Sequence, residues 1–541
     1  MSMDTLPFPL PIAPPRAHDQ KHREDTRAFS HKLFADFYRF PIQRARALLE
    51  TKPADFWIRK GEERALALFH AAAERVPAYK VFLKTHKLSS RSIRTVADFR
   101  HVPWVDKDNY LRKYSLSELS WDGQLHHSQI TSVSSGSSGA PFYWPRGSLL
   151  EVETAYVQEM YLVSIFEVDR LPTLYVDAFA MGMYIAGPVI LNSALRVAQK
   201  GHPMTVVTPG LEIEDVLRVI SGLAKYHRQI VLAGYPPFIK DILDAAEERG
   251  LDWKRVHVRF LLAGEGFSES WREYVAELVG QKKLAVDFIN IYGTADASIV
   301  GHETPTSIVI RRLAGSSPMT FSSLFPGEQA GRLPTLVQYY PTLKYFESLD
   351  GELLFSATAG IPLVRYNIHD RGGVFSWDDA LTRADVGGNT KLAQLLAVAR
   401  YTRKPWRLPF VYVFGKSDFT VTLYGLNVYP ENVKTALEDP SVRRLVTGRF
   451  TMSTEYRRQS PDQYLLVNVE LAERVRPTSF LKRHISSVLV KTLRRVNAEY
   501  GKLYTSIGGR ARPSVRLFKK GSSRQFVRGI KQGWVQRRSS S

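Results

Sequence analysis

The stretch Ser134-Ser135-Gly136-Ser137-Ser138-Gly139-Ala140-Pro141 places two glycines three positions apart within a run of hydroxyl residues. Glycine permits backbone conformations in which successive N–H groups converge on an anion, and serine hydroxyls add further donors. A strand-like run at residues 130–133 precedes this stretch, and a helical pattern follows it from about residue 148. Strand, glycine-rich loop and helix is the order of phosphate-binding loops, so the sequence predicts a loop that wraps a polyphosphate. A flexible linker of the same composition is the alternative.

Length and composition limit the class of protein. A chain of 541 residues is too long for one compact core, so two or three domains are expected. Its 44% hydrophobic and 23% charged residues are typical of globular proteins. The absence of cysteine excludes disulfides, cysteine-ligated zinc and covalent catalysis through a thiol of the protein itself. Any thioester chemistry therefore needs a thiol from another molecule.

The net charge of +21 is concentrated toward the C-terminus, where residues 501–541 carry eleven Lys or Arg and no Asp or Glu. A solvated basic tail explains this pattern, and so does binding of a polyanion such as ATP, CoA or an acidic carrier protein. The first fifteen residues contain several prolines and lack the apolar core of a signal peptide. The longest uncharged stretch, residues 178–195, is interrupted by Gly182, Gly187 and Pro188, which favours a buried core element over a membrane span. These patterns predict a cytoplasmic protein.

Beyond the loop, apolar strand-like runs alternate with amphipathic helical ones. The runs are residues 173–176, 214–226, 229–233, 238–249, 256–263, 270–279 and 288–292. This alternation predicts an α/β fold with layered sheets and helices. An Arg/Pro/aromatic segment near residues 401–413 indicates a domain boundary, so we expect an N-terminal extension at 1–55, a large domain at 56–414 and a small α+β domain at 415–541.

Further motifs surround the loop in a fixed order. Before it stand Val76-Pro77-Ala78-Tyr79 and Pro103-Trp104-Val105-Asp106-Lys107. After it come Gly264-Glu265-Gly266, Tyr292-Gly293-Thr294-Ala295-Asp296, Pro362-Leu363-Val364-Arg365-Tyr366 with Asp370, and Gly415-Lys416-Ser417-Asp418 followed by residues 424–433. Together they resemble the acyl-adenylate-forming (ANL) superfamily, and within it the phenylacetate–CoA ligase branch, over residues 62–535. The resemblance implies an AMP-binding adenylation domain at 56–414 and a mobile C-terminal domain that rotates about Asp418.

The resemblance also implies an ATP site. The phosphate-binding residues would be Ser134, Ser135, Gly136, Ser137, Ser138 and Gly139. Gly264 and Glu265 would let adenine or the acyl group lie against the backbone, although an ordinary turn with Ser268 as helix cap explains them too. Tyr292, Gly293 and Thr294 would lie near adenine. Asp370, from the motif that contains Arg365, would hold the ribose, because a carboxylate accepts two hydrogen bonds from a vicinal diol. A structural ion pair between Arg365 and Asp370 is the alternative.

The implied catalytic residues are Asp296, Lys416 and Lys531. Asp296 stands where the family has a glutamate that holds magnesium, and aspartate keeps the hard oxygen ligand that Mg²⁺ prefers. Lys416 replaces the usual arginine of the hinge and keeps its charge, although the following segment also fits a simple hairpin. Lys531 is the candidate for the late lysine that neutralises developing charge, with Lys519 and Lys520 as alternatives.

The chain departs from the family pattern at several positions. Ala295 lacks a hydroxyl donor that Thr294 can replace, and Ala140 stands where a lysine commonly follows the second glycine, a loss for which Arg146 is a candidate replacement. Residues 175–183 carry Ala and Met where the family has a glycine- and aromatic-rich pocket wall, which predicts a largely apolar acid pocket, and a plain core segment is the alternative.

The resemblance therefore implies an AMP-forming acid–thiol ligase for an aryl or fatty acid. The acid would attack the α-phosphorus of ATP, with magnesium bound, and the acyl group would pass to CoA or to the phosphopantetheine of a carrier protein. An amine acceptor stays open. So does a ligase scaffold that has lost catalysis and binds nucleic acid or another polyanion, to which Ala140, Ala295 and the basic tail point.

Overall fold

The computed structural model describes residues 41–125, 128–133, 142–182, 185–328, 333–386, 389–416, 421–423, 426–456, 463–523 and 525–526. Three predicted features lie outside these residues. They are the serine-glycine loop at 134–141, the pivot Asp418 and the late lysine Lys531.

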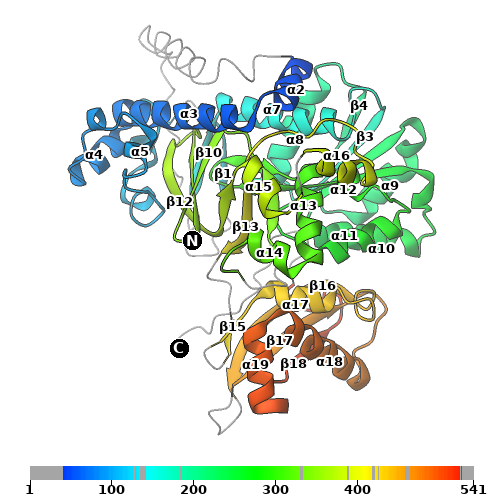
Figure 1. The fold of residues 1–541 in the computed structure, drawn as a ribbon. Coiled ribbons are helices and arrows are strands. Elements are labelled where there is room, and N and C mark those ends of the chain that lie inside the picture. Colours follow the sequence, from blue (N-terminus) through cyan, green and yellow to red (C-terminus); the bar gives the residue numbers. More distant parts are fainter. Residues whose placement is uncertain are drawn as a thin grey trace, which may run out of the picture.

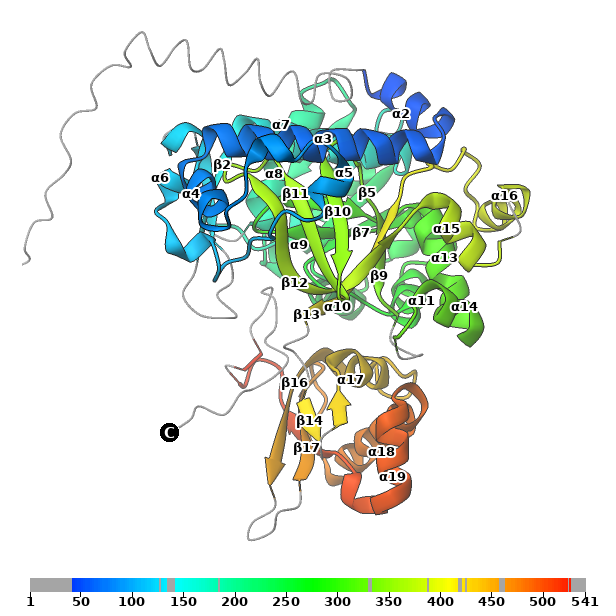
Figure 2. The same ribbon diagram turned by 60° about the vertical axis from the view of Figure 1, so that its left-hand side comes forward.

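The described chain forms a large lobe and a smaller one that lies below it in both views (Figures 1 and 2). The large lobe is built on an eleven-stranded sheet in the order β10-β11-β12-β13-β9-β8-β7-β6-β5-β3-β4. The strands are β3 (Thr173–Ala178), β4 (Met204–Val207), β5 (Gln229–Gly234), β6 (His257–Ala263), β7 (Phe288–Thr294), β8 (Ser298–His302), β9 (Thr335–Gln338), β10 (Lys344–Leu349), β11 (Glu352–Ala357), β12 (Leu363–Phe375) and β13 (Phe410–Lys416). Strands β3 to β7 pair in parallel, and the others join antiparallel.

The burial of the parallel strands explains why apolar runs in the sequence predicted their positions. Every residue of β3 and of β5 is buried, so both faces of these strands are covered by other elements. Such strands appear in a sequence as continuous apolar runs rather than as alternating ones. The helices that cross between them include α8 (Ala186–Ala198), α9 (Ile213–Leu223), α10 (Pro236–Glu248) and α11 (Glu269–Leu278), and α7 (Ser148–Ser164) precedes β3. The predicted α/β class is confirmed.

The N-terminal part of the described chain is helical. It contains α2 (Ile42–Thr51), α3 (Ala54–Arg75), α4 (Pro77–Thr85), α5 (Val96–Phe99) and α6 (Leu116–Leu119). Pro77 ends α3 and starts α4, because proline lacks an N–H but suits the first helical position. Residues 42–55 fall within the predicted extension, yet Ile42, Ala45 and Leu49 are buried in a core cluster of the large lobe. The domain boundaries themselves stay a prediction.

Further helices of the large lobe are α12 (Leu284–Asp287), α13 (Pro305–Ser316), α14 (Pro318–Leu324), α15 (Trp377–Arg383) and α16 (Asn389–Val398). A two-stranded sheet of β1 (Ser128–Val133) and β2 (Tyr143–Gly147) flanks the serine-glycine loop. The uncharged stretch 178–195 comprises the end of β3 and most of α8. Within the described residues, no helix combines the length and the apolar character that crossing a membrane requires.

The small lobe has a core of its own, built from residues between Val421 and Val515. Its strands are β14 (Val421–Leu423) and β15 (Leu426–Val428), which form a hairpin, and β16 (Val446–Tyr456), β17 (Gln463–Leu471) and β18 (Ser514–Phe518), which form a second sheet. Its helices are α17 (Pro430–Leu437), α18 (Ser479–Val496) and α19 (Ala498–Ile507). Helix α17 faces the large lobe, and α18 and α19 lie farther from it (Figures 1 and 2).

Candidate active site

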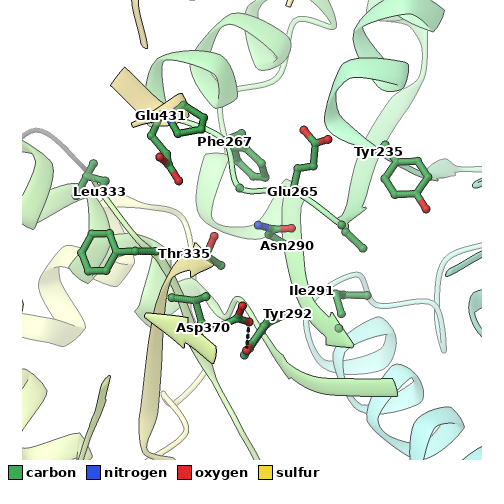
Figure 3. A pocket seen from close by; sticks show the side chains of 18 of the residues that line it. Tyr235, Glu265, Phe267, Asn290, Ile291, Tyr292, Leu333, Thr335, Asp370 and Glu431 are labelled. Carbon is green, nitrogen blue, oxygen red and sulfur yellow. Dashed lines mark hydrogen bonds between the residues drawn. The ribbon is translucent and has the colours of Figure 1, made fainter. Parts of the chain in front are cut away.

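A cavity of about 780 Å³ lies between the large lobe and α17. Its walls include Tyr235 after β5, Gly264 to Ser268 after β6, Asn290 to Asp296 along and after β7, and Asp370 on β12. Figure 3 shows several of these side chains around the hollow. The cavity thus lies at the carboxyl ends of parallel strands, where open α/β sheets bind ligands.

Gly264 begins the turn that follows β6 and requires glycine for two reasons. Its φ of +88° lies in the left-handed region. A Cβ atom at this position would also lie 2.5 Å from Cε1 of Tyr235. Ser268 then caps α11, since its Oγ accepts a hydrogen bond from the N–H of Trp271 at 3.0 Å. The turn therefore both caps a helix and lines the cavity, as do Glu265 and Gly266.

Tyr292 and Asp370 are brought together from β7 and β12. The Tyr292 hydroxyl donates a hydrogen bond to Oδ2 of Asp370 at 2.7 Å (Figure 3). Burial, reinforced by the negative charges of Asp370 and Asp296, raises the pKa of Tyr292 well above its usual range. The tyrosine therefore remains a neutral donor, and it orients the Asp370 carboxylate without neutralising its charge.

Asp296 is held in the same way by a second tyrosine. It lines the cavity and is 4% exposed. Burial first, and then the charge of Asp296 and a hydrogen bond to it, raise the pKa of Tyr366 well above its usual range. The negative charges of Asp296 and Asp370 both contribute to the raised pKa of each tyrosine. Thr294 lines the cavity as well, and its Oγ1 accepts the N–H of Ala297 at 3.0 Å.

The carboxylates of the site fit Mg²⁺ only if phosphate oxygens of a ligand supply part of its coordination. No group of three or more His, Cys, Asp or Glu side chains suited to a metal occurs among the residues that the structure describes. Mg²⁺ commonly takes one or two carboxylates from the protein and fills its remaining positions with phosphate oxygens and water. Among the carboxylates that line the cavity, Asp296 suits that mode of binding.

Arg365, also on β12, contacts residues outside the cavity lining. Its guanidinium pairs with Glu347, with Nε 3.0 Å from Oε2, and donates to the carbonyl of Val102. The predicted alternative of an ion pair between Arg365 and Asp370 is therefore wrong. The residues that line the cavity do not include Arg365, and its contacts support a structural role.

The motif around Asp106 pairs with the strand that carries Asp370. The Val105 N–H donates to the carbonyl of Arg365 at 3.2 Å, and its carbonyl accepts from Asn367 at 2.8 Å. Asp106 Oδ2 lies 3.0 Å from Nε2 of His369, and this hydrogen bond raises the pKa of His369. Lys107, the next residue, lines the cavity.

The other predicted lysines are less central in this arrangement. Lys416 pairs with Asp370 in the register between β12 and β13, which brings its backbone to the site. Lys519 and Lys520 do not line the cavity, and Lys520 pairs with Glu473 at 3.4 Å. Arg146, the candidate to replace a loop lysine, is buried in an ion pair with Glu151 and is also absent from the lining.

Sequence reasoning missed Asn290 and the contribution of α17. Asn290 is 4% exposed and lines the cavity, and its Oδ1 has no hydrogen-bond partner among the described residues (Figure 3). Its only signal was a polar residue within an otherwise apolar strand. From α17, Lys434 donates to the carbonyl of Gly266 and lies 3.9 Å from Oε2 of Glu265. These contacts join the small lobe to the turn after β6.

Similar proteins were found among solved structures. No protein-family model matches the chain, and no curated protein sequence matches it. A 2-hydroxyisobutyryl-CoA ligase in the postadenylation state, in complex with 2-HIB-AMP, superposes with a TM-score of 0.63 at 16% identity, over 91% of each chain. The same ligase with 2-HIB-AMP and CoA in the thioesterification state gives 0.51, again at 16% identity over 91% of each chain.

A second kind of enzyme has a related fold. The acyl acid amido synthetase AtGH3.15, in complex with 2,4-DB, gives a TM-score of 0.53 at 12% identity, over 89% of this chain and 90% of that chain. Similarity at these identities concerns architecture. The chain thus has the fold of acyl-adenylate-forming enzymes.

Proposed function

We propose that this protein is an ATP-dependent carboxylate ligase that forms an acyl-adenylate and passes the acyl group to a thiol. One observation carries the proposal. The turn at Gly264, the Tyr292–Asp296 motif and Asp370 are far apart in the sequence but line one cavity. Val133 and Phe142, which flank the serine-glycine loop, line the same cavity.

The nucleotide is proposed to lie across the ends of β6 and β7. The Asp370 carboxylate, oriented by Tyr292, would accept hydrogen bonds from the ribose hydroxyls. The turn Gly264-Glu265-Gly266 and the amide of Asn290 would lie against the base, whose edge offers both donors and acceptors. The phosphates would then extend toward the loop of Ser134 to Gly139. Asp296 would hold magnesium, which screens the phosphate charge when bound.

The acid is proposed to occupy the apolar side of the cavity. The lining there is formed by Ile185, Ala186, Val189, Ile190, Tyr235, Ile291 and Ile299. Such a surface suits an acid with an apolar body, aryl or aliphatic, and its carboxylate would point toward the α-phosphate. The wall predicted at residues 175–183 is a different segment: its described residues do not line the cavity, and Tyr175, Val176, Ala178 and Phe179 are buried in the core.

The reaction follows from that arrangement. A carboxylate oxygen attacks the α-phosphorus, a new P–O bond forms, and the bond to pyrophosphate breaks. A thiol then attacks the acyl carbon, and AMP leaves with the former carboxylate oxygen. The protein contributes position and charge rather than covalent chemistry, because it has no cysteine to carry the acyl group. Lys531 and Lys416 remain the proposed cationic residues, and rotation of the C-terminal domain about Asp418 would remove Lys531 and admit the acceptor.

CoA is the favoured acceptor, with a carrier-protein phosphopantetheine as the alternative. The 2-hydroxyisobutyryl-CoA ligase, whose fold this chain shares, supports a thiol acceptor. The higher TM-score with its postadenylation state supports an assignment of the present lobe arrangement to the adenylation half of the cycle. The amido synthetase fold favours an amine acceptor as the second candidate function. The phenylacetate–CoA ligase-like subtype and the cytoplasmic location stay predictions from the sequence.

Exchange of labelled pyrophosphate into ATP tests the proposal. Protein, magnesium and ATP are incubated with a panel of aryl, branched and fatty acids. We expect exchange that depends on one class of acid. If no acid supports exchange, while RNA binds with an affinity that falls steeply with salt, the chain is a polyanion-binding scaffold instead.

A further inference from the structure

Asp370 stands on an irregular part of β12. Leu354 on β11 pairs with Asn367, and the next pair joins the residue two positions before Leu354 to Arg371, four positions after Asn367. The extra residues on β12 form a β-bulge, which bends a strand and redirects its side chains. Ile368 and Asp370, within this bulge, both line the cavity. The direction of the Asp370 carboxylate therefore depends on how the bulge is held.

His369 is the central residue of the bulge and has an uncommon backbone conformation. Its φ of +58° lies in the left-handed region, which residues other than glycine adopt infrequently. Such a conformation persists where surrounding contacts hold it. One of these contacts is local, since the N–H of His369 donates a hydrogen bond to Oδ1 of Asn367 at 2.8 Å. The others involve the imidazole ring.

The ring of His369 lies between two carboxylates from different segments of the chain. Its Nε2 is 3.0 Å from Oδ2 of Asp106, and its Nδ1 is 3.2 Å from Oε2 of Glu352 on β11. Trp104 packs edge-on against the same ring, with the two ring centroids 6.1 Å apart. The charged side chains that contact the imidazole are thus both acidic.

A neutral imidazole cannot satisfy both carboxylates. It carries a single N–H, so its second nitrogen would turn a lone pair toward a carboxylate oxygen. The protonated ring donates from both nitrogens and places one positive charge between two negative ones. The hydrogen bond to Asp106 raises the pKa of His369, burial opposes this effect, and the charge of Glu352 raises the pKa further, so that it exceeds its usual value.

We propose that His369, as an imidazolium that links Asp106 to Glu352, is a positioning residue for Asp370. The assignment rests on the proposed function, because it concerns a ribose held by Asp370. His369 itself does not line the cavity. Its ring fixes the bulge, and the fixed bulge presents the adjacent Asp370 carboxylate to the hydroxyl of Tyr292 and to the ribose (Figure 3).

Comparison of ATP with 2′,3′-dideoxy-ATP isolates the ribose contact, because the analogue lacks both ribose hydroxyls and keeps the base and the phosphates. The wild type should bind ATP more tightly. In His369→Asn, ATP affinity should fall by about 3- to 10-fold, the range for one lost hydrogen bond, and affinity for the analogue should stay unchanged. Asparagine also adopts the left-handed conformation but cannot carry a charge. Titration calorimetry on the full chain measures both affinities.

The matched control is His227→Asn. The ring of His227 also bonds through both nitrogens, but to neutral groups, the carbonyl of Leu223 at 2.9 Å and Oγ1 of Thr205 at 3.0 Å. His227 does not line the cavity, so its variant should bind both ligands as the wild type does. Equal losses of ATP and of the analogue in His369→Asn would indicate a general structural effect and would overturn the assignment.

The pH profile separates a charged link from a neutral one. Because the folded pKa of His369 is raised above its usual value of 6.5, the ratio of the two affinities should be largest below about pH 6.5 and should fall as pH rises through the folded pKa. Both ligands carry the same phosphates, so their own titration cancels in this ratio. In His369→Asn, the ratio should not change over this range.

Glu352→Gln sharpens the same test, since it removes one of the two negative charges beside the ring. The ratio should then fall at a lower pH than in the wild type. A ratio that does not change with pH in the wild type, or an unchanged midpoint in Glu352→Gln, would overturn the assignment. A wild type that binds neither ligand would overturn the proposed function instead, so the two failures are distinguishable.

Discussion

Two groups of carboxylates near β7 differ in their partners. Asp296 and Asp370 line the cavity and are held by the hydroxyls of Tyr366 and Tyr292. In the second group, Glu303 accepts hydrogen bonds from both terminal nitrogens of Arg272, at 3.1 and 2.6 Å. Glu269 joins that second group through Arg272, Arg311 and Arg312.

The difference in partner separates a binding group from a structural one. An arginine neutralises a carboxylate and occupies its lone pairs, so the pair can be buried but offers little to a ligand. A tyrosine hydroxyl orients a carboxylate and leaves its charge in place. We therefore expect changes at Asp370 to act on nucleotide affinity, and changes at Arg272 to act on stability.

The largest expected effect belongs to the arginine-held group. Arg272→Met leaves the buried Glu303 without its arginine and removes one of the three arginines around Glu269, which should cost about 3–5 kcal/mol of unfolding free energy. Denaturant unfolding of the large lobe measures this loss. The control is Arg255→Met, since Arg255 pairs with Asp252 at the surface with its side chain 84% exposed, and should cost about 0–1 kcal/mol. Similar losses for the two variants would contradict the comparison.

Low pH should weaken the ion pairs of Glu269 with its three arginines. Burial alone would raise the pKa of Glu269, but Arg272, Arg311 and Arg312 outweigh it and lower that pKa to about 2. Because the folded pKa lies below the unfolded value of about 4.5, the stabilisation is present above pH 4.5 and is lost as pH falls toward about 2. The complete loss corresponds to about 3 kcal/mol. Unfolding curves from about pH 5 to about pH 3 should fall more steeply for the wild type than for Glu269→Gln, and parallel curves would refute the role of Glu269.

In the tyrosine-held group, Asp370→Ala should weaken ATP binding by about 1.5–3 kcal/mol, because a charge-assisted contact with ribose is lost. Stability should change little by comparison with Arg272→Met. Titration calorimetry with ATP measures the effect. Unchanged nucleotide affinity would show that Asp370 does not bind the ribose.

The smallest expected effect is that of Tyr292→Phe, which keeps the ring and removes the hydroxyl. Loss of one neutral donor should lower ATP affinity by about 0.5–1.5 kcal/mol, since Asp370 keeps its charge but loses its orientation. The same titration serves as the test. A loss as large as that of Asp370→Ala would mean that Tyr292 contributes more than the orientation of the carboxylate.

The sequence predicted the central sheet well because its parallel strands are buried on both faces. The runs at 229–233 and 256–263 correspond to β5 and β6 within one or two residues. The turn at Gly264, the Tyr292–Asp296 motif and Asp370 could be predicted to share one cavity because the resemblance groups them, although Asp370 lies within β12 rather than at a strand end. The pocket wall predicted at 175–183 was wrong, because residue type alone does not separate a ligand pocket from a buried core.

Contacts between distant segments could not be predicted. Arg365 and Tyr366 are neighbours in β12, where successive side chains alternate between faces. Tyr366 reaches Asp296, which leaves Arg365 on the far side with Glu347. The position of Lys107 depends on pairing between Val105 and β12, more than 250 residues apart in the sequence. The packing of α2 in the large core depends likewise on its tertiary partners.

The most direct test of the account follows the oxygen of the acid. The protein is incubated with magnesium, ATP, CoA and an acid that supports pyrophosphate exchange, with ¹⁸O in its carboxylate, and the products are analysed by mass spectrometry. Attack on the α-phosphorus predicts that AMP carries one atom of the label and that pyrophosphate carries none. Label in inorganic phosphate together with formation of ADP would place the attack at the terminal phosphorus and would contradict the proposed reaction.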